Sequence, residues 1–148
     1  MAQPSLTIVR RIKATPQKVY DAFTRPEMIS QWWGPDAGPV LHVETDVRVG
    51  GRFRIVFQTL DGETHEMTGA YRVVEPGRKL VWDTTWITYP ERQSLVTIDV
   101  APIPGGAELT VHHAQLHDEE VRDLHHAGWM GTLNKLQALL ETSLERIA

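Results

Sequence analysis

The stretch EEVRDLHHAGWMGTLNKLQALLETSLERIA, residues 119–148, decides the fold because it is typical of a single long amphipathic helix. At about 100° per residue, its apolar side chains fall on one stripe and its charged side chains fall opposite. The stripe contains Trp129, Leu133, Leu136, Leu140, Leu144 and Ile147. An apolar stripe this wide must pack on a sheet or another helix, so we expect the rest of the chain to provide that surface.

Two glycines, Gly128 and Gly131, interrupt this helical pattern. Each costs about 1 kcal/mol relative to alanine in a helix interior, which indicates that something approaches the helix closely. We expect close packing of backbone against a sheet. The alternative is that small residues leave room for a ligand under the helix. His125 and His126, one turn before Trp129, would then face the mouth of that space.

Composition is that of one ordinary soluble domain. The chain has 148 residues and a formal net charge of −4, with acidic and basic residues interspersed. We therefore expect a single domain over residues 1–148, with neither nucleic acid nor a membrane as partner. There is no cysteine, which excludes disulfides, a thiol nucleophile and thiolate metal ligands. Because neither an export signal nor a membrane-spanning run is present, a cytoplasmic protein is expected, as a monomer or a homodimer.

Hydrophobic periodicity predicts the remaining elements. Residues 6–13 alternate like a strand, and two short helices follow, one starting at Pro16 after the N-cap Thr15 and one after Pro26. Later alternation predicts strands at 40–47, 52–60, 64–74, 78–87, 93–100 and 107–115, separated by glycine and proline turns. The expected fold is an α+β domain: a curved, seven-stranded antiparallel sheet wrapped on the long C-terminal helix.

Strand parity predicts which side chains face that helix. They are Phe53, Ile55, Phe57, Met67, Tyr71, Trp82, Thr84, Trp86, Ile98, Val111 and His113. A curved sheet that carries large aromatic rings beneath a helix with glycines commonly encloses a cavity. We therefore expect these side chains, together with His125 and Trp129, to line a ligand pocket. His113 is the expected polar anchor, and Trp32 and Trp33 either wall the entrance or anchor the short helices on the sheet.

Several motifs in order resemble a known family. They are Arg10-x-Ile12-x-Ala14-x-Pro16, Trp32-Trp33-Gly34-Pro35, Asp46-x-Arg48-x-Gly50-Gly51-x-Phe53, Gly69-x-Tyr71, Leu109-Thr110-Val111-x-His113 and Gly128-Trp129-x-x-x-Leu133. Together they resemble the START-like (SRPBCC) superfamily, and more narrowly its branch of activator of heat-shock protein 90 ATPase homologues. The resemblance implies a helix-grip fold with a hydrophobic ligand cavity. Because no domain precedes the first strand, we expect a stand-alone bacterial member rather than a co-chaperone.

The sequence favours binding over catalysis. It contains no Gly-x-Ser-x-Gly elbow, and none of its serines lies beside a histidine in the sequence. A metal site is not expected, since His112 and His113 point to opposite faces of a strand, and no cofactor fingerprint is present. We therefore predict a binder of a small apolar or aromatic ligand. A cavity enzyme of cyclase or hydrolase type and a protein-interaction module remain the alternatives.

Overall fold

A computed structural model describes the backbone of residues 3–147 and the side chains of residues 3–142. Its elements follow the order that periodicity predicts. They are β1 (Leu6–Ile12), α1 (Pro16–Thr24), α2 (Pro26–Trp32), β2 (Val40–Thr45), β3 (Arg52–Gln58), β4 (Thr64–Glu75), β5 (Lys79–Trp86), β6 (Tyr89–Ile103), β7 (Gly106–Ala114) and α3 (Glu119–Ile147). Seven strands, two short helices after the first strand and one long closing helix confirm the predicted α+β class.

The two short helices begin where local chemistry indicates. Thr15 accepts a hydrogen bond from the Lys18 amide at 3.2 Å and so caps α1, while Pro16 occupies the first turn. Pro26 likewise starts α2, and the break between the helices lies at Arg25, whose backbone is extended. Trp32 is fully buried and its indole nitrogen donates to the carbonyl of Ala22 at 2.9 Å, so this tryptophan anchors α2 on α1.

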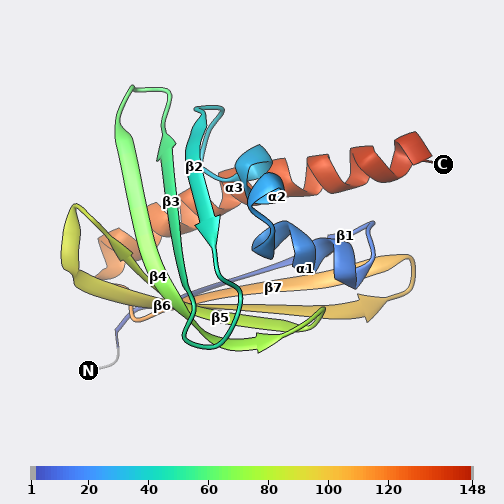
Figure 1. The fold of residues 1–148 in the computed structure, drawn as a ribbon, viewed down its shortest axis with the longest axis horizontal. Coiled ribbons are helices and arrows are strands. Elements are labelled where there is room, and N and C mark those ends of the chain that lie inside the picture. Colours follow the sequence, from blue (N-terminus) through green and yellow to red (C-terminus); the bar gives the residue numbers. More distant parts are fainter. Residues whose placement is uncertain (1–2, 148) are drawn as a thin grey trace.

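All strands form one antiparallel sheet in the order β1-β7-β6-β5-β4-β3-β2. Sequential strands are joined by hairpins from β2 to β7, and β1 completes the sheet by pairing with β7, with Ile8 opposite Val111. Turn glycines take positive φ, as at Gly62 (φ 87°) and Gly105 (φ 79°), which side chains rarely adopt. Figure 1 shows the sheet curling around α3.

Strand β6 is longer than the alternation indicates. The prediction stopped at residues 93–100, whereas the strand runs from Tyr89 to Ile103 and includes Pro90 and Pro102. Pairing continues past both prolines, from Trp86 opposite Tyr89 to Pro102 opposite Ala107, with a register shift at Thr85 and Trp86. Proline weakens a strand prediction because it donates no ladder hydrogen bond, but pairing on both sides of β6 outweighs that loss.

The core forms where α3 rests on the concave face of the sheet. Its predicted stripe is buried at Trp129, Leu133, Leu136 and Leu140, whereas the side chains of Leu144 and Ile147 lie outside the described residues. The short helices α1 and α2 lie on the same face beside the second half of α3 (Figure 1). These two helices cover only part of the concave face of the sheet, so the rest of that face is left uncovered beside the first half of α3.

Gly131 lies against backbone, whereas the nearest neighbour of Gly128 is a side-chain atom. A Cβ at Gly131 would lie 2.3 Å from the carbonyl oxygen of Pro35, so this glycine admits the backbone that follows α2. Close backbone packing is therefore correct for Gly131, although the neighbour is the segment 33–36 and not the sheet. At Gly128 the nearest atom to an added Cβ would be the Cβ of Pro35 at 4.0 Å, an ordinary van der Waals contact, so a Cβ fits there without any displacement.

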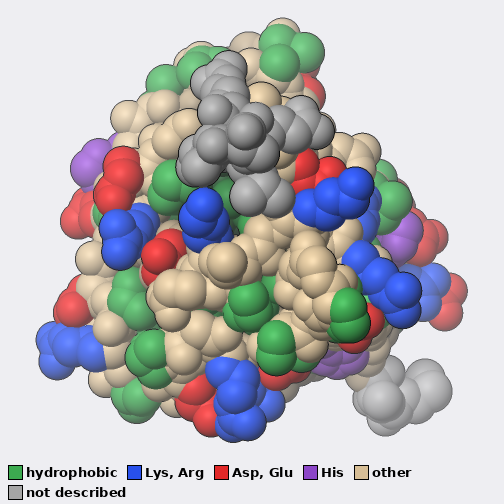
Figure 2. Space-filling model, turned by 90° about the vertical axis from the view of Figure 1, so that its right-hand side faces the viewer, with side chains coloured by type: hydrophobic (Ala, Val, Ile, Leu, Met, Phe, Trp, Pro, Cys, Tyr) green, Lys and Arg blue, Asp and Glu red, His purple; other side chains and the backbone are tan. Residues whose placement is uncertain are grey.

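The described surface on the side of the molecule where α3 ends is mixed in charge (Figure 2). Figure 2 views that end and shows basic and acidic side chains interspersed, with no broad area of one sign on this face. Across the described part of the chain, no helix has both the length and the apolar character needed to cross a membrane.

Candidate functional site

A large open cleft lies between the first half of α3 and the part of the sheet that α1 and α2 leave uncovered. Its volume is about 1150 Å³. Its lining includes residues from the end of hairpin β3–β4, the end of hairpin β5–β6, the connection from β7 to α3, and residues 33–36. These hairpin ends and the first turns of α3 gather on the left of Figure 1. Pockets for small molecules usually measure about 300–1,000 Å³, so this cleft is large enough for one.

Aromatic rings make up much of the wall. Those that line the cleft are Trp33, Phe57, Trp82, Trp86, Tyr89 and Trp129. Trp33 and Trp129 meet edge to face with their centroids 5.8 Å apart, and Phe57 and Trp86 meet in the same way at 6.0 Å. Such rings offer large apolar contact area at little conformational cost.

Most of the predicted pocket residues meet at this cleft. Lining it are Phe57, Met67, Trp82, Thr84, Trp86, His113, His125 and Trp129. They come from β3, β4, β5, β7 and α3, so the curved sheet brings together side chains that lie far apart in the sequence. The structure thus assembles this group at one cleft.

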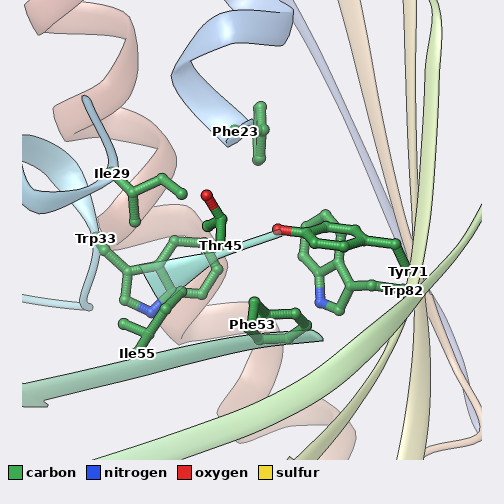
Figure 3. Close-up of a pocket in the computed structure, with 8 residues that line it drawn as sticks. All are labelled: Phe23, Ile29, Trp33, Thr45, Phe53, Ile55, Tyr71 and Trp82. Carbon is green, nitrogen blue, oxygen red and sulfur yellow. The ribbon is translucent and has the colours of Figure 1, made fainter. Parts of the chain in front are cut away.

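Three other predicted pocket residues, Phe53, Ile55 and Tyr71, lie elsewhere. They line a separate cavity beneath α1 and α2 that measures about 10 Å³, which is room for roughly one water molecule. In Figure 3, the Tyr71 hydroxyl reaches toward Thr45, and Phe53 lies beside Trp82. Their inward orientation is correct, but the short helices cover this half of the sheet and leave no space for a ligand. Burial also raises the pKa of Tyr71.

Ile98 and Val111 line neither cavity. Both are fully buried, face each other across β6 and β7, and belong to the continuous core. Parity alone cannot separate a core position from a pocket position, because both point to the same face.

A buried chain of hydrogen bonds runs along the inner wall of the cleft. The Nε1 of Trp129 donates to Nδ1 of His113 at 3.0 Å, and Nε2 of His113 lies 2.7 Å from the hydroxyl of Ser94. All three side chains are less than 10% exposed: His113 at 3%, and Ser94 and Trp129 both at 7%. The expectation that His113 anchors a ligand needs correction, since both of its ring nitrogens already have protein partners.

The direction of this chain follows from the chemistry of its members. An indole N–H can only donate, so Nδ1 of His113 must be the unprotonated acceptor. The neutral ring then carries its proton on Nε2, and this N–H donates a hydrogen bond to the Ser94 hydroxyl oxygen. Burial first, and then the nearby His125 and His112, lower the pKa of His113 to about 3, which keeps the ring neutral.

The arrangement resembles a catalytic triad but has the opposite polarity. In a working triad, the histidine accepts the serine proton at one nitrogen and donates to a carboxylate at the other. Here Trp129 supplies a donor where the carboxylate would accept, and Ser94 therefore accepts a hydrogen bond from the histidine instead of donating one to it. His113 in this state cannot act as a base toward Ser94.

Among the side chains that line the cleft, Thr84, Trp82 and Arg92 each carry a buried polar atom without a hydrogen-bond partner in the described part of the chain. Thr84 is 1% exposed and Trp82 is 4% exposed, and both line the cleft. Within the described residues, neither the Thr84 hydroxyl nor the Trp82 indole nitrogen makes a hydrogen bond. Leaving such a group without a hydrogen bond costs about 1–3 kcal/mol of stability. Buried polar groups without a partner are therefore uncommon in native interiors.

His125 has the opposite tautomer from His113. Its Nδ1 lies 2.9 Å from the carbonyl oxygen of Val121, which can only accept, so Nδ1 carries the proton. Burial lowers the pKa of His125, although the bond to Val121 opposes that shift. The ring is therefore neutral near pH 7, and its Nε2 is an acceptor. Its centroid is 5.0 Å from that of His113.

Charged side chains surround the mouth. The carboxylates that line the cleft are Asp36, Asp61, Glu63, Asp118 and Glu120. Among the described lysine and arginine side chains, Arg92 lines it. The Arg92 guanidinium stacks on the ring of Tyr89 at 4.2 Å. The mouth is thus negative. Among the residues that the structure describes, no three His, Asp or Glu side chains are grouped so that they could hold a metal ion.

Ser94 and Trp33 are the main additions to the predicted site. Ser94 shares the parity of Val96 and Ile98 in β6, a signal that places its hydroxyl on the inner face. Trp33 was expected either to wall an entrance or to anchor a helix, and it walls the cleft while Trp32 is the anchor.

Fold and cleft together define the class: a helix-grip domain, in which a curved antiparallel sheet holds one long C-terminal helix. The chain matches the family described as Activator of Hsp90 ATPase homolog 1-like protein over residues 13–141, and it belongs to that family. The resemblance that the sequence motifs indicate is therefore confirmed.

Solved structures share this fold over nearly the whole chain. Protein CV1439 from Chromobacterium violaceum is 27% identical with a TM-score of 0.84, covering 93% of this chain and 98% of that one. The AHSA1 protein from Silicibacter pomeroyi is 26% identical with a TM-score of 0.82, covering 96% and 99%. The protein of unknown function SA2116 from Staphylococcus aureus, 20% identical with a TM-score of 0.80 and 96% coverage of both chains, shares the fold alone. No curated protein matches the chain.

Proposed function

We propose that this protein binds a small apolar or aromatic molecule in the cleft between α3 and the sheet. The observation that carries the proposal is the cleft itself: about 1150 Å³, walled by aromatic rings, with unpartnered polar atoms on its buried inner wall. A ligand site is typically a mostly apolar concavity with a few polar groups that fix orientation. Filling the cleft would remove apolar surface from water and give those polar atoms partners.

Binding accounts for the site better than hydrolysis does. Ser94 is the serine placed beside a histidine in the cleft, and the Trp129 donor gives that histidine the wrong tautomer for activating it. A cyclase-type reaction would need an available base, and the acceptor nitrogen of His125 is one group in the cleft that could supply it. Turnover that depends on His125 would therefore be the sign of an enzyme.

Gly128 offers a direct test of the cleft. It lines the cleft and has no close neighbour, so Gly128→Leu would place a side chain in the space without displacing backbone. Ala138→Leu is the matched control, because it introduces the same leucine side chain at an exposed position of α3. The neutral probe N-phenylnaphthylamine, which fluoresces in apolar surroundings, should bind saturably to the wild type and to Ala138→Leu, and about tenfold or more weakly to Gly128→Leu.

Native mass spectrometry of freshly purified protein completes the test, since a natural ligand should be retained in the wild type and lost from Gly128→Leu. Equal probe binding by all three proteins would overturn the proposal. Absence of saturable binding would do the same and would favour the interaction-module alternative.

A further inference from the structure

We propose that the cleft selects ligands that carry a hydrogen-bond-accepting oxygen, a carbonyl group above all, and that the hydroxyls of Ser94 and Thr84 bind this oxygen. The inference rests on the proposed function, because it names the chemical class of the ligand that the cleft takes. It is carried by the direction of one hydrogen-bond chain and by the placement of two strand residues.

The direction of the chain fixes what Ser94 can offer. Trp129 donates to His113, so His113 donates in turn to the Ser94 oxygen. The hydroxyl proton of Ser94 must then point to a third group. Among the side chains that the structure describes, Ser94 has His113 as its hydrogen-bond partner. His113 cannot accept the Ser94 hydroxyl proton, because its Nε2 is the donor and its Nδ1 already accepts from Trp129. Ser94 is therefore a buried donor directed by the residues behind it.

Thr84 lies where it can act together with Ser94. The two residues are directly opposite each other in the pairing of β5 with β6, so their side chains share the inner face of the sheet. Both line the cleft, and the Thr84 hydroxyl has no partner within the described part of the chain.

This wall therefore presents hydrogen-bond donors beside aromatic rings. A carbonyl oxygen has two lone pairs and can accept from two hydroxyls at once, whereas a methylene group in its place would leave both donors unpaired. Sites built to hydrogen-bond a ligand reject the analogue that lacks the matching group. A neutral aromatic ketone fits both the apolar walls and the donor pair.

Benzophenone and diphenylmethane form the test pair, since they share two phenyl rings and differ by a carbonyl in place of a methylene. Wild-type protein should bind benzophenone about five- to tenfold more tightly than diphenylmethane, as measured by quenching of tryptophan fluorescence. Ser94→Ala and the nearly isosteric Thr84→Val should each reduce that ratio, and the double variant should bring it close to one. Thr85→Val, on the opposite face of β5, is the control and should keep the wild-type ratio.

The carbonyl stretch of bound benzophenone gives an independent readout, because hydrogen bonding lowers its frequency. The infrared band should shift down in the wild type and return toward its apolar-solvent position in Ser94→Ala and Thr84→Val. Diphenylmethane affinity should stay the same in every variant, which shows that each one keeps its cleft.

The outcomes separate the two proposals. Equal affinity of the wild type for both compounds, or a ratio that survives in the double variant, would overturn the donor-pair assignment while leaving cleft binding intact. Failure of both compounds to bind would overturn cleft binding of apolar aromatics together with the inference that rests on it.

Discussion

At the scale of single residues, His113 shows how a buried titratable group makes stability depend on pH. Burial lowers its pKa from the ordinary value of 6.5 to about 3, so between these values the unfolded chain binds more protons than the folded protein. The unfolding free energy then rises with pH in this window. The stability that the neutral, buried His113 side chain contributes is lost as pH falls from about 6.5 toward about 3, because the unfolded chain takes up the proton first.

We expect His113→Gln to weaken this pH dependence. Between about pH 6.5 and about pH 5, the wild type should lose about 1–2 kcal/mol of stability more than the variant does, because the variant has no buried imidazole to protonate. Urea denaturation at a series of pH values measures this. The control is Thr110→Val, a non-titratable position on the other face of β7, which should keep the wild-type slope. Identical slopes for His113→Gln and the wild type would mean that His113 titrates as it does in water.

Strand parity could predict that His113 faces inward, but it could not predict what the imidazole touches. Its partner Ser94 is set by the pairing of β6 with β7, and Trp129 by the rotation of α3 on the sheet. Both depend on contacts between residues that lie far apart in the chain. The sequence therefore indicates a polar group in the pocket and leaves its hydrogen-bonding role open.

At the scale of elements, α3 contains two glycines whose replacement should have opposite effects. Gly131→Ala places a Cβ 2.3 Å from the Pro35 carbonyl oxygen, so the backbone must move; the expected loss is about 1–3 kcal/mol. Gly128→Ala meets its nearest atom only at 4.0 Å, and it should gain up to about 1 kcal/mol from helix propensity. Urea denaturation of both variants checks the contrast. A stabilised Gly131→Ala would show that residues 33–36 do not rest on α3.

The docking of α3 on the sheet should be the main source of its stability. Leu133 and Leu136 are 1% and 0% exposed, so replacing either with alanine should cost about 2–5 kcal/mol through lost burial and a residual cavity. Met130→Ala is the control on the same helix, because Met130 is 37% exposed; its cost should stay within about 0.5 kcal/mol of zero. Equal effects at all three positions would contradict the described orientation of α3.

Element boundaries were predictable where local chemistry sets them and less so where pairing does. Thr15-Pro16 and Pro26 start their helices as expected, since capping and a fixed φ act within one turn. The ends of β6 were missed because Pro90 and Pro102 obscure a strand that its neighbours hold in place.

At the scale of the whole molecule, the unequal filling of the concave face creates the site. The helices α1 and α2 cover the half that contains Phe53 and Tyr71, and the other half stays open. Alternation predicts one continuous apolar face and so could not show where the core ends and the cleft begins. That division depends on the lengths of α1 and α2 and on the path of residues 33–36 across α3.

The charge around the mouth should act on the ligand as a whole, in addition to the donors inside. Five carboxylates and Arg92 line the described cleft, and the chain carries a formal net charge of −4. A negative mouth lowers the local concentration of anions, and salt screens this effect. We therefore expect benzoylbenzoate, which adds one carboxylate to benzophenone, to bind more weakly than benzophenone itself. Raising ionic strength from about 0.01 M to about 0.1 M shortens the Debye length from about 30 Å to about 10 Å, so the gap between the two affinities should narrow. In the double variant Glu63→Gln, Glu120→Gln, benzoylbenzoate should bind more tightly than it does to the wild type, with benzophenone unchanged. Tighter binding of benzoylbenzoate than of benzophenone to the wild type would contradict this expectation, and would mean that the Arg92 guanidinium outweighs the carboxylates around it.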